Sequence, residues 1–357
     1  MLIFAQKSRV ASTLMILILV NLLACAQGGK WDDEEIANVF DGIDISNALA
    51  QLEAKGVTPY DFGFQLMGSG HPDKAKEWFV AAGIHLARTG ADMEQKSKFV
   101  YGLAWMKWIT GDASGAIEDA KYILAHKPPP LIQARTFYLL GAVSVDEHAF
   151  EDADFNLNAG IKAYGDLKRP GGQYLCASML AMCAVFEGNF DQVAPWLEKA
   201  SKYNDLTEKM GFKRWNSGRY YEIQSELRYA QGDYAGALFA ARESAGTYRE
   251  GNDVLLADEV DAKIGFLLLL NGEPKAAADL ATKLWEKHHL SRDRGRLLAY
   301  NSITLMKLAL CANQTNDVMT NENAARAWAS SGPGGKALTT LIDWAKDKKK
   351  FPCPAWK

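Results

Sequence analysis

The six residues GDASGA, at positions 111–116, carry the pattern that decides the fold of this 357-residue chain. A glycine permits the left-handed backbone that ends one helix, an aspartate opens the next helix, and the alanine lets two helices approach closely. Blocks of the same kind return after 41, 37, 40, 44 and 40 residues. They are GHPDKA (70–75), GDASGA (111–116), HAFEDA (148–153), GNFDQV (188–193), GDYAGA (232–237) and GEPKAA (272–277). Each block predicts a helix–turn–helix unit, and a repeat of this length predicts stacked pairs of helices.

A second feature supports this register without using the turn. A small residue stands seven positions before the start of every block. The six are Gly63, Ala104, Gly141, Ala181, Ser225 and Gly265. Close antiparallel crossing of two helices requires a small residue at the crossing point, so the spacing predicts that each pair crosses there.

The pattern resembles the tetratricopeptide repeat (TPR), in which an aromatic residue and Leu-Gly mark the first helix and an alanine and an aromatic residue mark the second. Phe137 with Leu140-Gly141 fits the first helix, and Ala75 with Phe79 fits the second. Pro128 falls where the repeat ends. The spacing is longer than the 34 residues typical of the family. The resemblance implies an all-α fold, an α-solenoid of about six TPR-like helix–turn–helix repeats with capping helices at both ends.

The N-terminus has the pattern of a secretion signal. Lys7 and Arg9 precede an apolar run over residues 10–24, which is shorter than the ~20 residues needed to cross a bilayer. The sequence LLAC at 22–25 resembles the bacterial lipobox, which implies acyl chains on Cys25. Ala26 after this cysteine implies a protein anchored in the outer membrane and facing the periplasm. The alternative is an ordinary cleaved signal in which Cys25 has no special role.

These observations predict how the chain is divided. The expected segments are a lipoprotein signal peptide (1–24), a lipidated tether (25–31), N-terminal helices (32–57), the TPR-like repeat array (58–290) and C-terminal capping helices with a tail (291–357).

Four cysteines remain besides Cys25. Cys176 and Cys183 lie seven residues apart in one expected helix, about 10 Å along its axis, which is too far for a disulfide. Both are therefore expected to be small buried apolar side chains. Cys311 and Cys353 could join the last long helix to the tail, in a compartment that permits disulfides, or could stay unbonded.

The resemblance also implies a binding surface, because the first helix of each TPR pair lines the concave face. Transferred to this sequence, those positions are rich in aromatic residues, with a few cations at the edge. The predicted groove comprises Tyr60, Phe64, Lys98, Tyr101, Trp105, Trp108, Arg135, Tyr138, Met182, Phe186, Tyr229 and Phe266. Aromatic side chains contribute strongly to binding in grooves. The alternative is that these rings pack in the protein core.

Nothing in the sequence points to catalysis, a cofactor or a metal. The six histidines are scattered, and residues 332–335 (GPGG) lack the neighbours that a phosphate-binding loop needs. With 40 basic and 43 acidic residues the net charge is −3, which argues against nucleic-acid binding.

We therefore expect a membrane-anchored scaffold or assembly factor of the bacterial cell envelope, which is not an enzyme and binds a partner protein. The alternatives are a lipoprotein that binds a glycan or small apolar molecule, and a structural subunit of an envelope complex. The oligomeric state and the identity of the partner are not set by the sequence.

Overall fold

All the regular structure that the computed structural model describes is helical. The described residues are 45–54, 56–68, 72–88, 90, 92–211, 217–251, 254–288, 295–330, 335–347, 351 and 353. They form sixteen α-helices and one short 3₁₀ helix, with no strand among them. The all-α class expected from the sequence is thus confirmed. None of these helices is long and apolar enough to cross a bilayer.

The helices are mostly three to five turns long. Their bounds are α4 Ile45–Ala54, α5 Pro59–Gly68, α6 Pro72–Arg88, α7 Met93–Ile109, α8 Ala113–Ala125, α9 Pro130–Asp146, α10 Phe150–Asp166, α11 Pro170–Glu187, η2 Phe190–Gln192, α12 Val193–Lys209, α13 Gly218–Ala230, α14 Tyr234–Glu250, α15 Val254–Leu270, α16 Pro274–His288, α17 Gly295–Cys311, α18 Thr315–Ser330 and α19 Gly335–Lys346.

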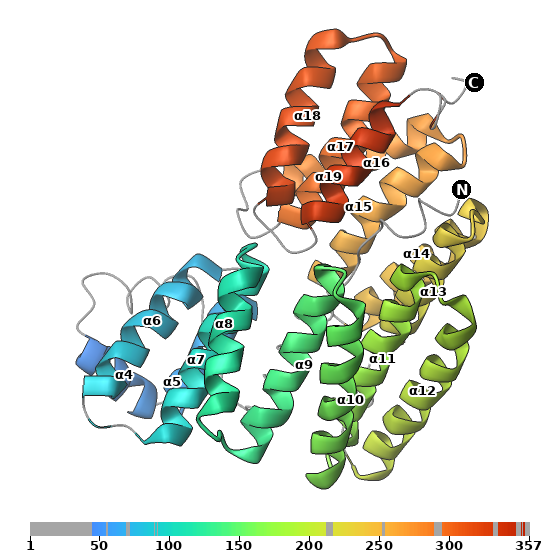
Figure 1. The fold of residues 1–357 in the computed structure, drawn as a ribbon. Coiled ribbons are helices and arrows are strands. Elements are labelled where there is room, and N and C mark those ends of the chain that lie inside the picture. The colour runs from blue at the N-terminus through green and yellow to red at the C-terminus, as the bar shows by residue number, and fades with distance from the viewer. Residues whose placement is uncertain are drawn as a thin grey trace.

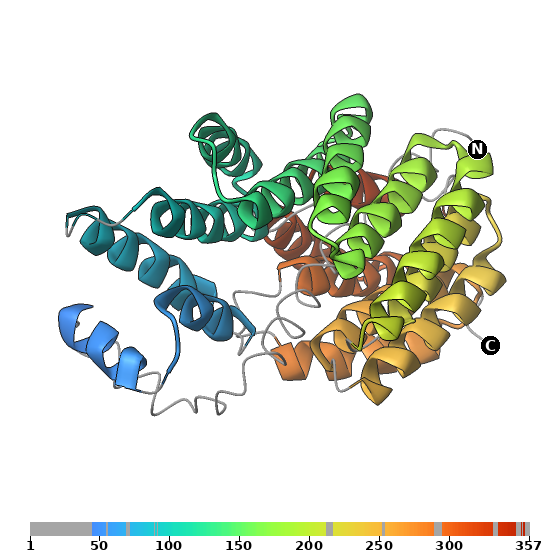
Figure 2. The ribbon, with the colours of Figure 1, turned by 90° about the horizontal axis from the view of Figure 1, so that it is seen from below.

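Helices that are neighbours in sequence pack on each other in pairs. The pairs are α5 with α6, α7 with α8, α9 with α10, α11 with α12, α13 with α14, α15 with α16, and α17 with α18. In Figure 2 they follow a curved path, from the blue and teal helices α4–α8 on one side to the yellow-green helices on the other. Helices α17–α19, in red tones, lie beyond α15 in Figure 1.

The turns within these pairs have the backbone that the sequence predicts. Gly111, Gly188 and Gly232 have φ between 82° and 89°, in the left-handed region that suits glycine. His148 takes the same place in the third block with φ 57°, so this turn tolerates a residue other than glycine. The aspartate after the glycine then caps the second helix, as when Asp112 Oδ1 accepts a hydrogen bond of 2.8 Å from the N–H of Gly115.

The small residues lie where paired helices come closest. A methyl group on Gly63 would lie 2.4 Å from the Phe79 ring, and one on Gly141 would lie 2.4 Å from Leu157 Cγ. Gly265 differs, because its nearest neighbour beyond its own helix is Thr304 of α17, at 3.8 Å from the position of a Cβ. The small residue seven positions before the block therefore lies at a close helix crossing in the first and third pairs. In the last pair, at Gly265, there is room for a side chain.

The buried apolar residues form two cores that meet at α13. The first core runs from Ala48 to Ile223 and the second from Tyr229 to Phe351. Between them α13 buries four polar side chains, namely Arg219, Glu222, Ser225 and Glu226. The junction is therefore held by hydrogen bonds and charge pairs, because buried polar groups need partners.

The C-terminal segment closes the second core. Phe351 stacks on Trp344 with ring centroids 4.8 Å apart, and its carbonyl accepts a hydrogen bond from the fully buried Lys307 Nζ. A disulfide joins Cys311 at the end of α17 to Cys353. Cys176 and Cys183 are buried free thiols on α11.

We predict that Gly141→Ala lowers the free energy of unfolding by about 1–3 kcal/mol, because its methyl group would overlap Leu157. Gly246 in α14 is the matched control, since a methyl group there meets nothing within 4 Å. Gly246→Ala should be neutral or raise the free energy of unfolding by about 0.5–1 kcal/mol. Denaturant unfolding of both variants measures this, and equal effects would contradict the crossing geometry.

We also predict that Cys353→Ser lowers the free energy of unfolding by about 2–4 kcal/mol, because the disulfide closes a loop with a sequence separation of 42 residues. A reducing agent should lower the stability of the wild type by a similar amount and leave the variant unchanged. A wild-type protein that is insensitive to reduction would contradict this role of the disulfide.

Candidate functional site

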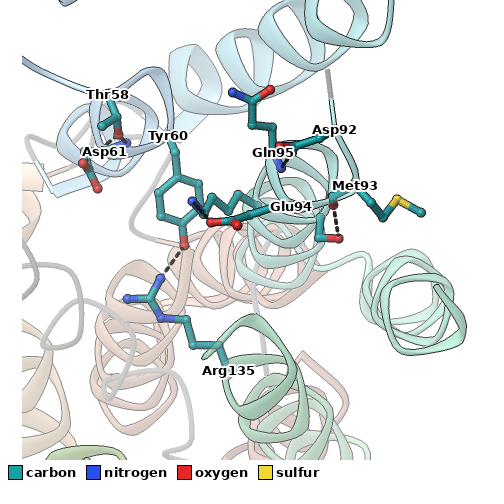
Figure 3. Close-up of polar contacts among 10 residues, drawn as sticks. Thr58, Tyr60, Asp61, Asp92, Met93, Glu94, Gln95 and Arg135 are labelled. Carbon is teal, nitrogen blue, oxygen red and sulfur yellow. Dashed lines mark hydrogen bonds and ion pairs between the residues drawn. The ribbon is translucent and has the colours of Figure 1, made fainter. Parts of the chain in front are cut away.

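First helices of different pairs meet on one inner face. Arg135 Nη1 on α9 donates a hydrogen bond of 3.0 Å to Tyr60 Oη on α5, across 75 residues of sequence. Figure 3 shows the guanidinium of Arg135 pointing to the phenol of Tyr60. Because α5 and α9 are separated by a whole helix pair, this contact indicates a tight curve at this end of the molecule.

The side chains along this face form a continuous series, here called the inner row: Tyr60, Tyr101, Trp105, Arg135 and Tyr138. The Tyr101 and Trp105 rings have centroids 5.8 Å apart, and the Trp105 and Tyr138 rings 6.3 Å apart. Phe64 links Tyr60 to Tyr101, at 4.8 Å and 6.3 Å. Ring contacts at these distances stabilise the packing of the helices that carry them.

The predicted groove residues are mostly interior. All ten aromatic and methionine residues of the set are at most 9% exposed, so they do not line an open groove. Their burial agrees with the alternative that these rings pack in the protein core. The physical reason is the tight curve, which brings first helices into contact with one another. Whether any of these residues binds a partner stays a prediction.

The structure places the predicted groove residues in two different hydrophobic cores. Met182 and Phe186 belong to the first core with the inner row, whereas Tyr229 and Phe266 belong to the second core. Phe266 is covered by the C-terminal segment, with ring centroids 5.9 Å from Phe351 and 6.1 Å from Trp344. The C-terminal helices thus fill the place where the sequence predicted the far end of a groove.

Of the two cationic residues of the predicted groove, Lys98 and Arg135, Lys98 keeps the edge position that was expected, and it forms an ion pair of 2.7 Å with Glu94. Arg135 is half-buried in the inner row. Arg219 could not be recognised from the sequence as a buried residue, yet it is 1% exposed and its Nη1 lies 3.1 Å from Glu222 Oε2.

A buried polar cluster surrounds Arg219. Tyr248 Oη also donates to Glu222 Oε2, at 3.1 Å, so one carboxylate oxygen accepts from two donors. One turn further along α13, Glu226 pairs with Lys263 of α15 at 2.5 Å. Sequence reasoning missed Glu222, Tyr248 and Lys263 because their residue types are usually exposed or packed singly, and only the fold brings them together.

Two donors of the inner row lack a partner. Trp105 Nε1 and Tyr138 Oη are buried and make no hydrogen bond with any described residue. The neighbouring Trp108 differs, because its Nε1 donates a hydrogen bond of 2.7 Å to Asp146 Oδ2. A buried donor without an acceptor costs about 1–3 kcal/mol, so two in one row are a feature that needs an explanation.

The titratable side chains of the inner row are protonated at neutral pH. Burial raises the pKa of the Tyr138 phenol well above its ordinary value, although the charge of Arg219 acts in the opposite direction. Burial has the same effect on the pKa of Tyr101. Burial would lower the pKa of Arg135, but the phenols of Tyr60 and Tyr101 outweigh it and the pKa is raised. At neutral pH the row therefore presents O–H, N–H and guanidinium groups.

No group of three or more histidine, cysteine, aspartate or glutamate side chains that could hold a metal ion occurs in the part of the chain that the structure describes. Cys25 and the predicted signal lie outside that part.

We predict that Tyr138→Phe leaves the free energy of unfolding unchanged or raises it slightly, because it removes a hydroxyl that has no acceptor. Tyr248→Phe is the matched control. It should lower the free energy of unfolding by about 1–3 kcal/mol, since the buried Glu222 loses a donor. Chemical unfolding of the two variants tests this, and a large loss for Tyr138→Phe would show that its hydroxyl has a partner.

Comparison with known proteins adds no family to these observations: no family model matches the chain, and no curated protein matches it.

Proposed function

We propose that the protein is a TPR-like α-solenoid lipoprotein that acts as a membrane-anchored scaffold or assembly factor in the bacterial cell envelope, by binding a segment of a partner protein. The observation that carries the proposal is the pair of buried, unpaired donors in the inner row, Trp105 Nε1 and Tyr138 Oη. Stacked helix pairs bind partners along such faces, and an acceptor from a docked segment would satisfy both donors.

The chemistry of the row suits an extended segment with acceptor groups. Trp105 and Arg135 offer only donors. The Tyr138 hydroxyl can donate or accept, and it has no hydrogen-bond partner among the described residues. Backbone carbonyls and a carboxylate therefore complement all three side chains. The rings of Tyr101 and Trp105 provide apolar contact beside those donors. This combination of a few polar groups with aromatic anchors is typical of peptide recognition.

Access to the row is controlled by the contact between Tyr60 and Arg135. This hydrogen bond joins α5 to α9, and Arg135 is the member of the row that reaches solvent. A carboxylate of the partner can replace the Tyr60 phenol as the acceptor for Arg135, because a charged acceptor binds guanidinium more strongly than a neutral one. Release of Tyr60 would then separate α5 from α9 and admit the segment.

The lipid anchor supports the same function. Acyl chains on Cys25 would hold the protein at the outer membrane, on its periplasmic side, close to partners in the same membrane. Confinement to a surface raises the effective concentration of the partner, so a modest affinity of the inner row is sufficient.

We predict that crosslinking in membranes of the native host, followed by affinity purification, recovers a stoichiometric membrane-protein partner. The double variant Trp105→Phe/Tyr138→Phe should lose that partner, because it removes both donors and keeps aromatic rings. Tyr122→Phe, on the exposed surface of α8, is the matched control and should retain it. A partner retained by the double variant, with its fold intact by unfolding measurements, would move binding to another face.

The anchor has its own test. Cys25→Ser should shift the protein from the membrane fraction to the soluble fraction and abolish labelling by a fatty-acid analogue. Cys176→Ser, which alters a buried thiol of α11, should change neither. Labelling that persists in Cys25→Ser would contradict lipidation at this residue.

A further inference from the structure

A cavity of about 150 Å³ lies between α11, α12 and α13, away from the inner row. It is lined by Tyr174, Ser178, Leu197, Ala200, Ser201, Asn204, Ser217, Tyr220 and Tyr221. Six of these nine residues carry a hydroxyl and one carries an amide, whereas none carries a charge. Such a lining pairs with the hydroxyl groups of a neutral ligand and offers nothing to balance an ion.

Beside the cavity, α13 packs mainly on its pair partner α14. Gly218, the first residue of α13, lies so close to α14 that a methyl group on it would be 2.7 Å from the Tyr248 ring. Ser244 Oγ of α14 also donates a hydrogen bond of 2.9 Å to the Gly218 carbonyl.

The lining has a floor and a mouth. Tyr174, Ser178 and Asn204 are buried and form the floor, whereas Ser201, Ser217 and Tyr220 are exposed and form the mouth. Tyr220 is 45% exposed, so its ring can contact a bound molecule without any change in the helices. Small-molecule sites likewise combine placed polar groups with aromatic side chains.

The volume sets the size of the ligand. A closed apolar cavity of about 150 Å³ accommodates benzene, so this cavity has room for one six-membered ring, or for about five water molecules. Because the site is open at Tyr220, substituents of that ring can project into solvent. A neutral pyranose sugar is a ring of this size that carries several hydroxyl groups and no charge.

We propose that this cavity binds a single neutral pyranose ring, either as a free monosaccharide or as the end of a glycan chain. The hydroxyls of the sugar pair with Ser178, Ser201, Ser217 and the Tyr221 phenol, and the apolar face of the sugar lies on Tyr220. This inference is independent of partner binding at the inner row, which shares no residue with the cavity.

The test is a titration of the full chain with D-glucose, N-acetyl-D-glucosamine, D-glucuronate and benzene, followed by ligand-observed NMR. Saturable binding of at least one of the two neutral sugars is expected, with D-glucuronate weaker by about tenfold or more because no cation lines the site. Binding of neither neutral sugar, equal binding of D-glucuronate, or binding of benzene alone would each overturn the proposal. Maltose distinguishes a free monosaccharide from the end of a glycan chain. A site for a chain end binds maltose, because it leaves room for the second ring, whereas a site for a free monosaccharide does not.

Variants locate the binding. Tyr220→Ala should weaken sugar binding by about tenfold or more and leave the unfolding curve unchanged, because this side chain is exposed. Tyr122→Ala, which removes an equally exposed tyrosine of α8, is the matched control and should bind as the wild type does. Sugar binding that is unchanged in Tyr220→Ala would place the sugar elsewhere and overturn the assignment to this cavity.

Discussion

The close crossing of paired helices at a residue without a side chain is the constraint on which the rest of this structure depends. Gly63 under the Phe79 ring and Gly141 against Leu157 let the helices of a pair approach until a methyl group would overlap. Pairs this thin can stack with strong curvature, and the curvature brings α5 into contact with α9. The left-handed turns at Gly111 and its counterparts end the first helix of a pair, so that the chain reverses into the second.

The curvature has consequences for the inner face. Side chains that would be exposed in a more open array are pressed together, and Trp105 and Tyr138 are buried with their polar atoms unpaired. Charges are also buried at α13, where they are stabilised because Glu222 accepts from Arg219 and Tyr248. Charged groups in a core are tolerated only with such partners, since removing one leaves the other buried and uncompensated. The inner face is thus polar in chemistry although it is interior in position.

Features encoded locally could be predicted from the sequence, and features that depend on the distance between non-consecutive helices could not. The turn glycines, the aspartate caps and the crossing at Gly141 are local, and each is visible in a stretch of about 20 residues. The burial of the predicted groove residues does not follow from any short stretch of sequence. It depends on the angle between successive helix pairs, and that angle is the sum of many small packing differences that no motif encodes. The cover of Phe266 by Phe351 and the lining of the cavity beside Tyr220 each bring together residues that are far apart in sequence. The polar partners Asp146 and Glu222 were missed for the same reason.

The most direct test of the account is the indole N–H resonance of Trp105, compared by NMR with that of Trp108 in the same protein. Trp108 donates to Asp146, whereas Trp105 has no acceptor among the described residues. We predict that the Trp105 indole proton resonates upfield of the Trp108 proton in the free protein. It should move downfield when the partner recovered by crosslinking is added, with Trp108 unchanged. A Trp105 resonance that is already hydrogen-bonded in the free protein, or that does not move with the partner, would contradict the claim that the inner row keeps its donors for a bound segment.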